Sequence, residues 1–111
     1  MRSCKKGGQE VEARIFEDTW WINEIKTDLE LREEFEGYLQ SCEFHIFGFM
    51  EYHFHPYGYA AIWLIGESHL AIHTFHEHGK IYIQLSSCNE YKSYRFKEIM
   101  AVRYPHAQKI N

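Results

Sequence analysis

The sequence has few of the features that mark membrane, secreted or disulfide-built proteins. Its longest uninterrupted apolar run covers only residues 60–65, far short of the roughly 20 residues of a transmembrane helix. Residues 1–9 are polar and lack the apolar stretch of a signal peptide. The three cysteines are too few, and odd in number, for a disulfide framework. We therefore expect reduced thiols, a cytoplasmic location and no contact with membranes.

An excess of positive charge is also missing. Twelve Lys and Arg stand against 16 Asp and Glu, so the net charge is −4 with the histidines neutral. Nucleic-acid-binding proteins are usually basic, so we expect no nucleic-acid partner. Hydrophobic residues make up 45% of the 111 positions and aromatic residues 17%, which is enough apolar material for one globular domain and excludes a disordered chain.

The residue patterns predict a single α+β domain over residues 10–111 behind a flexible leader, residues 1–9. Alternating or β-branched and aromatic runs predict strands over 10–16, 43–54, 59–65, 69–75 and 80–86. The strand over 59–65 is apolar on both faces, which is typical of a central, buried strand. The segment 18–26 has no clear pattern, and its Trp20 and Trp21 are expected to cover a core or lie at an interface.

Two helices are predicted, over residues 28–40 and 89–100. Thr27 and Glu30 have the spacing of a capping box before the first helix, and Asn89 is a candidate N-cap for the second. The order of strand, helix, several strands and helix favours a two-layer sandwich, in which an antiparallel sheet packs both helices on one face.

Side chains that could take part in catalysis or ligand binding gather on the other face of the predicted sheet. Alternation places His73 and Phe75 on one face of their strand, and Cys88 follows the next strand on a corresponding face. The eight histidines allow a metal site as one reading, but no standard zinc spacing is present. Hydrolysis by a serine nucleophile is weaker still, because Ser68 lacks the G-x-S-x-G elbow.

The stretch 54–88 resembles the processing region of the short prokaryotic S-adenosylmethionine decarboxylase proenzymes, which depend on a pyruvoyl group. The matching elements are Phe54-x-Pro56-x-Gly58, Glu67-Ser68-His69, His73-Thr74-x-x-Glu77 and Cys88. Their joint spacing between apolar strands carries the resemblance, since each element alone is a weak signal.

The resemblance implies that the chain makes its own cofactor. The Ser68 hydroxyl would attack the Glu67 carbonyl, and elimination would split the chain into a β chain, 1–67, and an α chain, 68–111. A pyruvoyl group would remain at position 68 and form a Schiff base with the substrate amine, which supplies the electron sink that decarboxylation needs.

The resemblance also implies roles for individual residues, and none of these roles is a metal ligand. Cys88 matches the proton donor of decarboxylation, and His73 the histidine that promotes elimination during processing. Phe54 and Phe75 match the aromatic residues that sandwich the adenine, and Glu77 the acid that binds the ribose hydroxyls. In this family the active site is shared across a dimer interface, so a homodimer of processed units is implied, acting in spermidine synthesis.

The sequence departs from the family pattern in a few places. Ala60 stands where a serine usually assists processing, so another group such as Tyr59 would have to replace that hydroxyl. Ser87-Cys88-Asn89 stands where T-C-G is usual. Two alternatives therefore stay open: a pyruvoyl-dependent ornithine or arginine decarboxylase on the same scaffold, or an inactive relative that is not processed and acts as a partner subunit.

Overall fold

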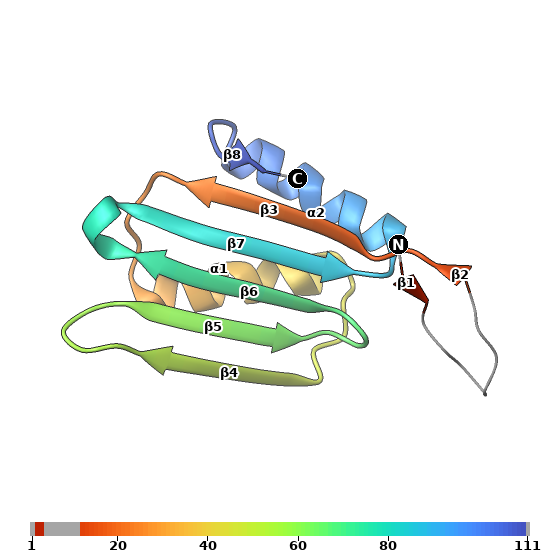
Figure 1. Cartoon of the computed structure of the whole chain (residues 1–111), viewed down its shortest axis with the longest axis horizontal. Coiled ribbons are helices and arrows are strands. Elements are labelled where there is room, and N and C mark those ends of the chain that lie inside the picture. The colour runs from red at the N-terminus through yellow and green to blue at the C-terminus, as the bar shows by residue number, and fades with distance from the viewer. Residues whose placement is uncertain (1, 4–11, 111) are drawn as a thin grey trace.

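The computed structural model describes residues 2–3 and 12–110, and within them the chain forms a main sheet with two α-helices, and a separate small sheet (Figure 1). In chain order the elements are β1 (Arg2–Ser3), β2 (Glu12–Ala13), β3 (Phe16–Ile22), α1 (Asp28–Ser41), β4 (Gly48–His53), β5 (Tyr59–Leu64), β6 (His69–Phe75), the short 3₁₀ helix η1 (His76–His78), β7 (Lys80–Ser87), α2 (Glu90–Arg103) and β8 (Gln108–Lys109).

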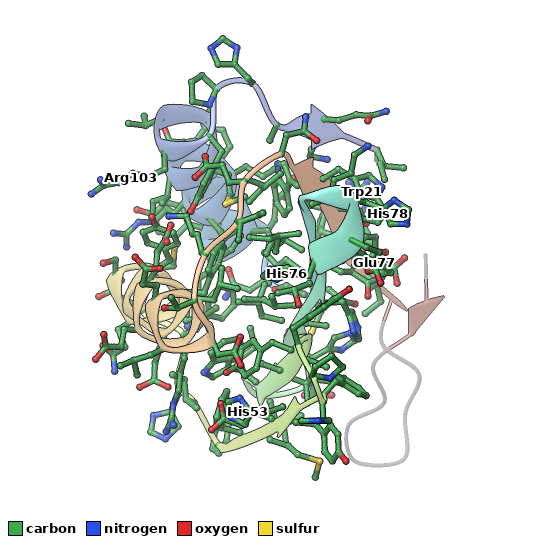
Figure 2. The ribbon with its side chains drawn as sticks, turned by 90° about the vertical axis from the view of Figure 1, so that its left-hand side faces the viewer. Trp21, His53, His76, Glu77, His78 and Arg103 are labelled. Carbon is green, nitrogen blue, oxygen red and sulfur yellow. The ribbon has the colours of Figure 1, made fainter. Side chains whose placement is uncertain are left out.

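The main sheet has six strands in the order β4-β5-β6-β7-β3-β8, and every neighbouring pair is antiparallel. The two short strands β1 and β2 pair with each other. Both helices lie on the same side of the sheet (Figures 1 and 2). The predicted two-layer α+β sandwich, with an antiparallel sheet and two helices on one face, is confirmed.

The predicted helix starts are also confirmed. The Thr27 hydroxyl accepts the Glu30 backbone N–H at 3.1 Å, and the Glu30 carboxylate accepts the Thr27 N–H at 2.8 Å, so the capping box holds the first turn of α1. The Asn89 side chain accepts the Lys92 N–H at 2.9 Å at the start of α2. Each cap satisfies backbone donors that a helix N-terminus otherwise leaves without partners.

The first long strand differs from the prediction over 10–16. β3 starts at Phe16 and runs to Ile22, through the segment that showed no clear pattern. The polar residues at its start obscure the alternation, and tertiary contacts stabilise them: buried Asp18 lies 2.9 Å from the Lys109 ammonium on β8. Residues 10 and 11, and most of the expected leader, lie outside the described residues.

The core fills the space between the sheet and the helices. Trp20 on β3 contacts Phe96 on α2 at 5.7 Å between ring centroids, and Phe35 on α1 contacts the same ring at 6.4 Å. Trp63 on β5 and Leu85 on β7 are fully buried on this side. The helices therefore cover one face of the central strands.

The opposite face, which we call the open face, is not covered by any of the described residues. It was expected to be buried at β5, but Ile62 and Leu64 on that strand are 44% and 52% exposed. Met50 on the neighbouring edge strand β4, which is shorter than the predicted strand over 43–54, is 72% exposed. A contiguous exposed apolar surface of this kind is typical of an interaction site.

Candidate active site

Ser68 lies in the tight turn that joins β5 to β6. The Ile65 N–H donates to the Ser68 carbonyl at 2.9 Å, and Gly66 inside the turn has φ +82°, a backbone conformation that favours glycine. Glu67 is exposed, whereas Ser68 is only 6% exposed. The Glu67–Ser68 bond therefore lies where the chain reverses direction, with the serine turned inward.

Cys88 directly follows β7 and lies beside this turn. Its backbone N–H donates to the Ser68 hydroxyl oxygen at 3.3 Å. Glu67, Ser68 and Cys88 thus form one group, which we call the Ser68 end of the sheet. The predicted cleavage site and the predicted proton donor are brought together, although they are 20 residues apart in sequence.

The other predicted site residues lie toward the opposite end of the same strands. His73 and Phe75 are on the far half of β6, Glu77 is in η1 and Phe54 follows β4. All four are exposed. We call this group the Phe75 end, and Figure 2 shows Glu77 and His78 there, on the side of the sheet away from the helices.

One chain does not join the two groups. Ser68 and His73 are five residues apart along an extended strand, which corresponds to about 17 Å. The histidine that was expected to promote processing is therefore far from the serine of its own chain. An active site with all of the predicted residues needs both ends of the sheet to meet.

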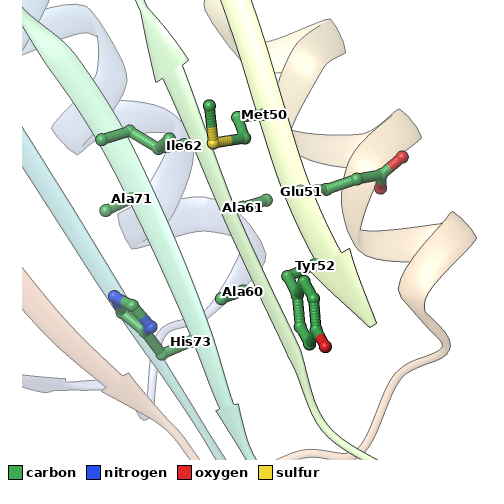
Figure 3. Close-up of a pocket in the computed structure, with 8 residues that line it drawn as sticks. All are labelled: Met50, Glu51, Tyr52, Ala60, Ala61, Ile62, Ala71 and His73. Carbon is green, nitrogen blue, oxygen red and sulfur yellow. The ribbon is translucent and has the colours of Figure 1, made fainter. Parts of the chain in front are cut away.

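A shallow hollow of about 230 Å³ opens beside the Phe75 end (Figure 3). Ala60 pairs with Tyr52 on one neighbouring strand and with His73 on the other, so its small side chain leaves a gap between two rings. The residues lining the hollow are Met50, Glu51, Tyr52, Ala60, Ala61, Ile62, Ala71 and His73.

Tyr59 does not fill the place of the missing serine hydroxyl. It points to the core side, is 1% exposed, and donates its hydroxyl to Glu51 at 2.5 Å. Burial, together with the hydrogen bond to Glu51, raises the pKa of Tyr59 above its ordinary value. The suggestion that Tyr59 compensates for Ala60 is therefore wrong, because adjacent residues of a strand face opposite sides of the sheet.

Trp21 is a candidate site residue that the sequence did not assign. Its ring lies 5.3 Å from Phe75 and 5.1 Å from Tyr82, measured between centroids. Trp20, the preceding residue, packs in the core instead. Adjacent residues of a strand face opposite sides of the sheet, so one tryptophan faces the core and the other the open face. Which one faces the core depends on the register of β3 against β7, and the irregular sequence before them concealed that register.

An ionic cluster lies on the helix side of the sheet. Glu34 accepts hydrogen bonds from the hydroxyls of Tyr38 and Tyr104, and its carboxylate lies 2.9 Å from the Lys26 ammonium. Burial acts to raise the pKa of Glu34, but the hydrogen bonds from Tyr104, Tyr38 and Lys26 outweigh it and leave this pKa below its ordinary value. Burial and Glu34 together raise the pKa of both tyrosines.

Among residues 2–3 and 12–110, no group of three or more His, Cys, Asp or Glu side chains could hold a metal ion. In the same part of the chain, no helix is long and apolar enough to cross a membrane. The metal reading of the histidines thus gains no support from the described residues.

The chain is similar to known proteins in sequence and in fold. The S-adenosylmethionine decarboxylase family profile matches residues 16–108. A curated S-adenosylmethionine decarboxylase proenzyme of Aquifex aeolicus (strain VF5) is 31% identical over 84 residues, which are 73% of this chain and 62% of that protein. The crystal structure of the adenosylmethionine decarboxylase from Aquifex aeolicus VF5 has the same fold, with a TM-score of 0.74 at 20% identity over 90% of this chain and 89% of the other. The chain therefore belongs to the S-adenosylmethionine decarboxylase family.

Proposed function

We propose that this protein is a self-cleaving, pyruvoyl-dependent S-adenosylmethionine decarboxylase that serves spermidine synthesis in the cytoplasm. The observation that carries the proposal is the contact between the Ser68 hydroxyl and the Cys88 backbone, in a chain that matches this family over residues 16–108. Ser68 supplies the cofactor, and Cys88 supplies the proton that replaces carbon dioxide on the substrate.

The residues at the Ser68 end fit the formation of a pyruvoyl group. The Ser68 Oγ bonds to the Glu67 carbonyl carbon while the peptide C–N bond breaks and its nitrogen takes up a proton, which leaves an ester. Loss of the Ser68 α-proton then breaks the Cβ–Oγ bond and releases the Glu67 carboxylate. Tautomerisation and hydrolysis with loss of ammonia complete the group, whose ketone acts as the electron sink for decarboxylation.

The Phe75 end fits a ligand with a flat aromatic ring and a positive charge. Phe54, Phe75 and Trp21 offer exposed or half-exposed ring faces, which suit stacking against adenine and attraction of a sulfonium. The exposed Glu77 carboxylate can accept hydrogen bonds from ribose hydroxyls. These groups favour S-adenosylmethionine over ornithine or arginine, whose distal cations need no aromatic sandwich.

A homodimer with shared sites follows from the separation of the two ends. Two protomers can stack their open faces about a two-fold axis that lies between the sheets, parallel to them and perpendicular to the strands. This arrangement brings the Ser68 end of one protomer over the Phe75 end of its partner. The exposed Met50, Ile62 and Leu64 side chains then become the centre of the interface. Such an isologous contact buries the same apolar patch on both protomers.

The proposal is tested by the intact mass of the purified, denatured protein, with and without a carbonyl reagent. We expect two fragments that separate between Glu67 and Ser68, and reagent added only to the C-terminal fragment. Ser68→Ala should remain one chain and lack all activity. A wild-type chain that stays whole after long incubation would instead identify an inactive relative, and cleavage with release of carbon dioxide from ornithine or arginine alone would overturn the substrate.

A further inference from the structure

We propose that Cys88 takes part in chain cleavage through its backbone N–H, and that the Ser87 hydroxyl is the positioning group that aims this N–H at Ser68. The inference deepens the proposed self-cleavage and rests on it. It assigns Cys88 two separate tasks: its amide acts on the serine before cleavage, and its thiol acts on the substrate afterwards.

The Cys88 amide is directed toward the Ser68 side chain. This N–H donates to the Ser68 oxygen at 3.3 Å rather than to a neighbouring strand carbonyl. Ser68 is 6% exposed, so few water molecules compete for the hydroxyl. A donated hydrogen bond stabilises negative charge on Oγ. Oγ carries such charge when the hydroxyl proton leaves, and again when the Cβ–Oγ bond breaks and Oγ becomes an oxygen of the Glu67 carboxylate.

The Ser87 hydroxyl holds the Cys88 amide in this direction. β7 ends at Ser87, and the chain turns there into α2. The Ser87 hydroxyl accepts the Asn89 N–H at 3.0 Å and lies 3.4 Å from the Asn89 carbonyl oxygen, to which it donates. The bond from the Asn89 N–H closes a ring that contains the Ser87–Cys88 and Cys88–Asn89 peptides, so it restrains the direction of the Cys88 N–H. Asn89 is fixed in turn by its capping bond to the Lys92 N–H.

The Ser87 side chain does not lie on the substrate side of the sheet. Its side chain is completely buried and points to the core side of β7, away from the open face where substrate would bind. It therefore acts on Ser68 only through the Cys88 backbone. A hydroxyl-bearing residue at position 87 is needed for this, and either serine or threonine satisfies the requirement.

The experiment follows chain cleavage over time by intact mass. It starts from full-length chain that is either newly translated or freshly purified, denatured and refolded. We expect Ser87→Ala to slow cleavage about tenfold, because the variant keeps the Cys88 N–H but loses the hydrogen bonds that orient it, and tenfold is about the worth of one such bond. Ser87→Thr should restore cleavage to within a few-fold of wild type. Cys88→Ala keeps the backbone N–H and should cleave at close to the wild-type rate.

Ser93→Ala is the matched control. Ser93 is also a buried serine, 1% exposed, on the neighbouring helix α2, but its hydroxyl has no hydrogen-bond partner. Its replacement should leave cleavage unchanged, and thermal midpoints of all variants exclude unfolding as the cause. Cleavage of Ser87→Ala at the wild-type rate, or equal slowing in Ser93→Ala, would overturn the inference. Failure of the wild-type chain to cleave would overturn the proposed function itself.

Discussion

At the scale of single residues, the two cysteines on the helix and sheet sides of the structure have different chemical fates. Cys42 is completely buried and burial raises the pKa of its thiol, whereas Cys88 is half-buried beside Ser68. Of these two residues, Cys88 is the one that lies beside Ser68, where the proposed proton donor has to be. The burial of Cys42 among apolar side chains is a packing feature.

Cys88→Ala is expected to cleave normally but to turn over S-adenosylmethionine about 100-fold more slowly or worse, because a positioned general acid contributes at least about that factor. The measurement is carbon dioxide release per cleaved chain. Cys42→Ala is the control and should retain turnover while losing some thermal stability. Equal turnover by the two variants would remove Cys88 from the reaction.

The adjacent tryptophans offer a second comparison of single residues. Trp21→Ala should raise the KM for S-adenosylmethionine about 2- to 10-fold, since an aromatic contact of the kind it makes with Phe75 is worth about 0.5–1.5 kcal/mol. Trp20→Ala removes a core ring and should cost about 3–5 kcal/mol of unfolding free energy. Denaturant titration and steady-state kinetics separate the two effects. A Trp21→Ala variant with wild-type KM would exclude Trp21 from the binding site.

At the scale of secondary-structure elements, α1 is joined to the end of α2 through a partly buried carboxylate. Glu34 on α1 accepts hydrogen bonds from Tyr38 on the same helix and from Tyr104, which caps α2. Phe35 and Tyr104 stack beside these bonds, with ring centroids 6.3 Å apart. The cluster therefore couples the two helices through polar and apolar contacts in the same place.

This cluster predicts how stability depends on pH. The pKa of Glu34 is below its ordinary value of 4.5 in the folded chain, so its stabilising contribution is complete above about pH 4.5 and is lost as the pH falls through the lowered pKa. Glu34→Gln should lower the free energy of unfolding by about 1–3 kcal/mol at neutral pH and make its acid dependence shallower. Glu33→Gln, a change at the exposed neighbour, should do neither when both are measured by urea unfolding across pH.

The elements also show which parts of the fold could be predicted from sequence. Helix starts were predictable because Thr27, Glu30 and Asn89 act on backbone groups only three residues away. The hairpin from β6 to β7 was predictable because both strands alternate clearly. β3 was not, because Asp18 is stabilised by Lys109, about 90 residues later in the chain, and no local pattern reports such a partner.

At the scale of the whole molecule, the structure shows an arrangement of the predicted site residues that their spacing in the sequence does not reveal. The spacing of the motifs over 54–88 predicts which residues form the site, but it could not show that they lie at two ends of one sheet. That separation follows from the antiparallel register, in which β6 carries the chain from Ser68 to Phe75 and β7 returns it to Cys88. β5 is apolar on both faces: one face meets the helices, and the other would meet the partner protomer in the proposed dimer.

Shared sites predict complementation between two inactive variants. Cys88→Ala disables the Ser68 end, Glu77→Gln disables the Phe75 end, and both variants should still cleave. In a mixed dimer, one site combines both damaged ends and the other combines both intact ends. Random exchange makes about half of the dimers mixed, so the mixture should recover about a quarter of wild-type activity for a two-fold dimer with two sites. Refolding the variants together and assaying carbon dioxide release measures this recovery. Each variant refolded alone is the control, and a mixture no more active than the controls would mean that each protomer completes its site by itself.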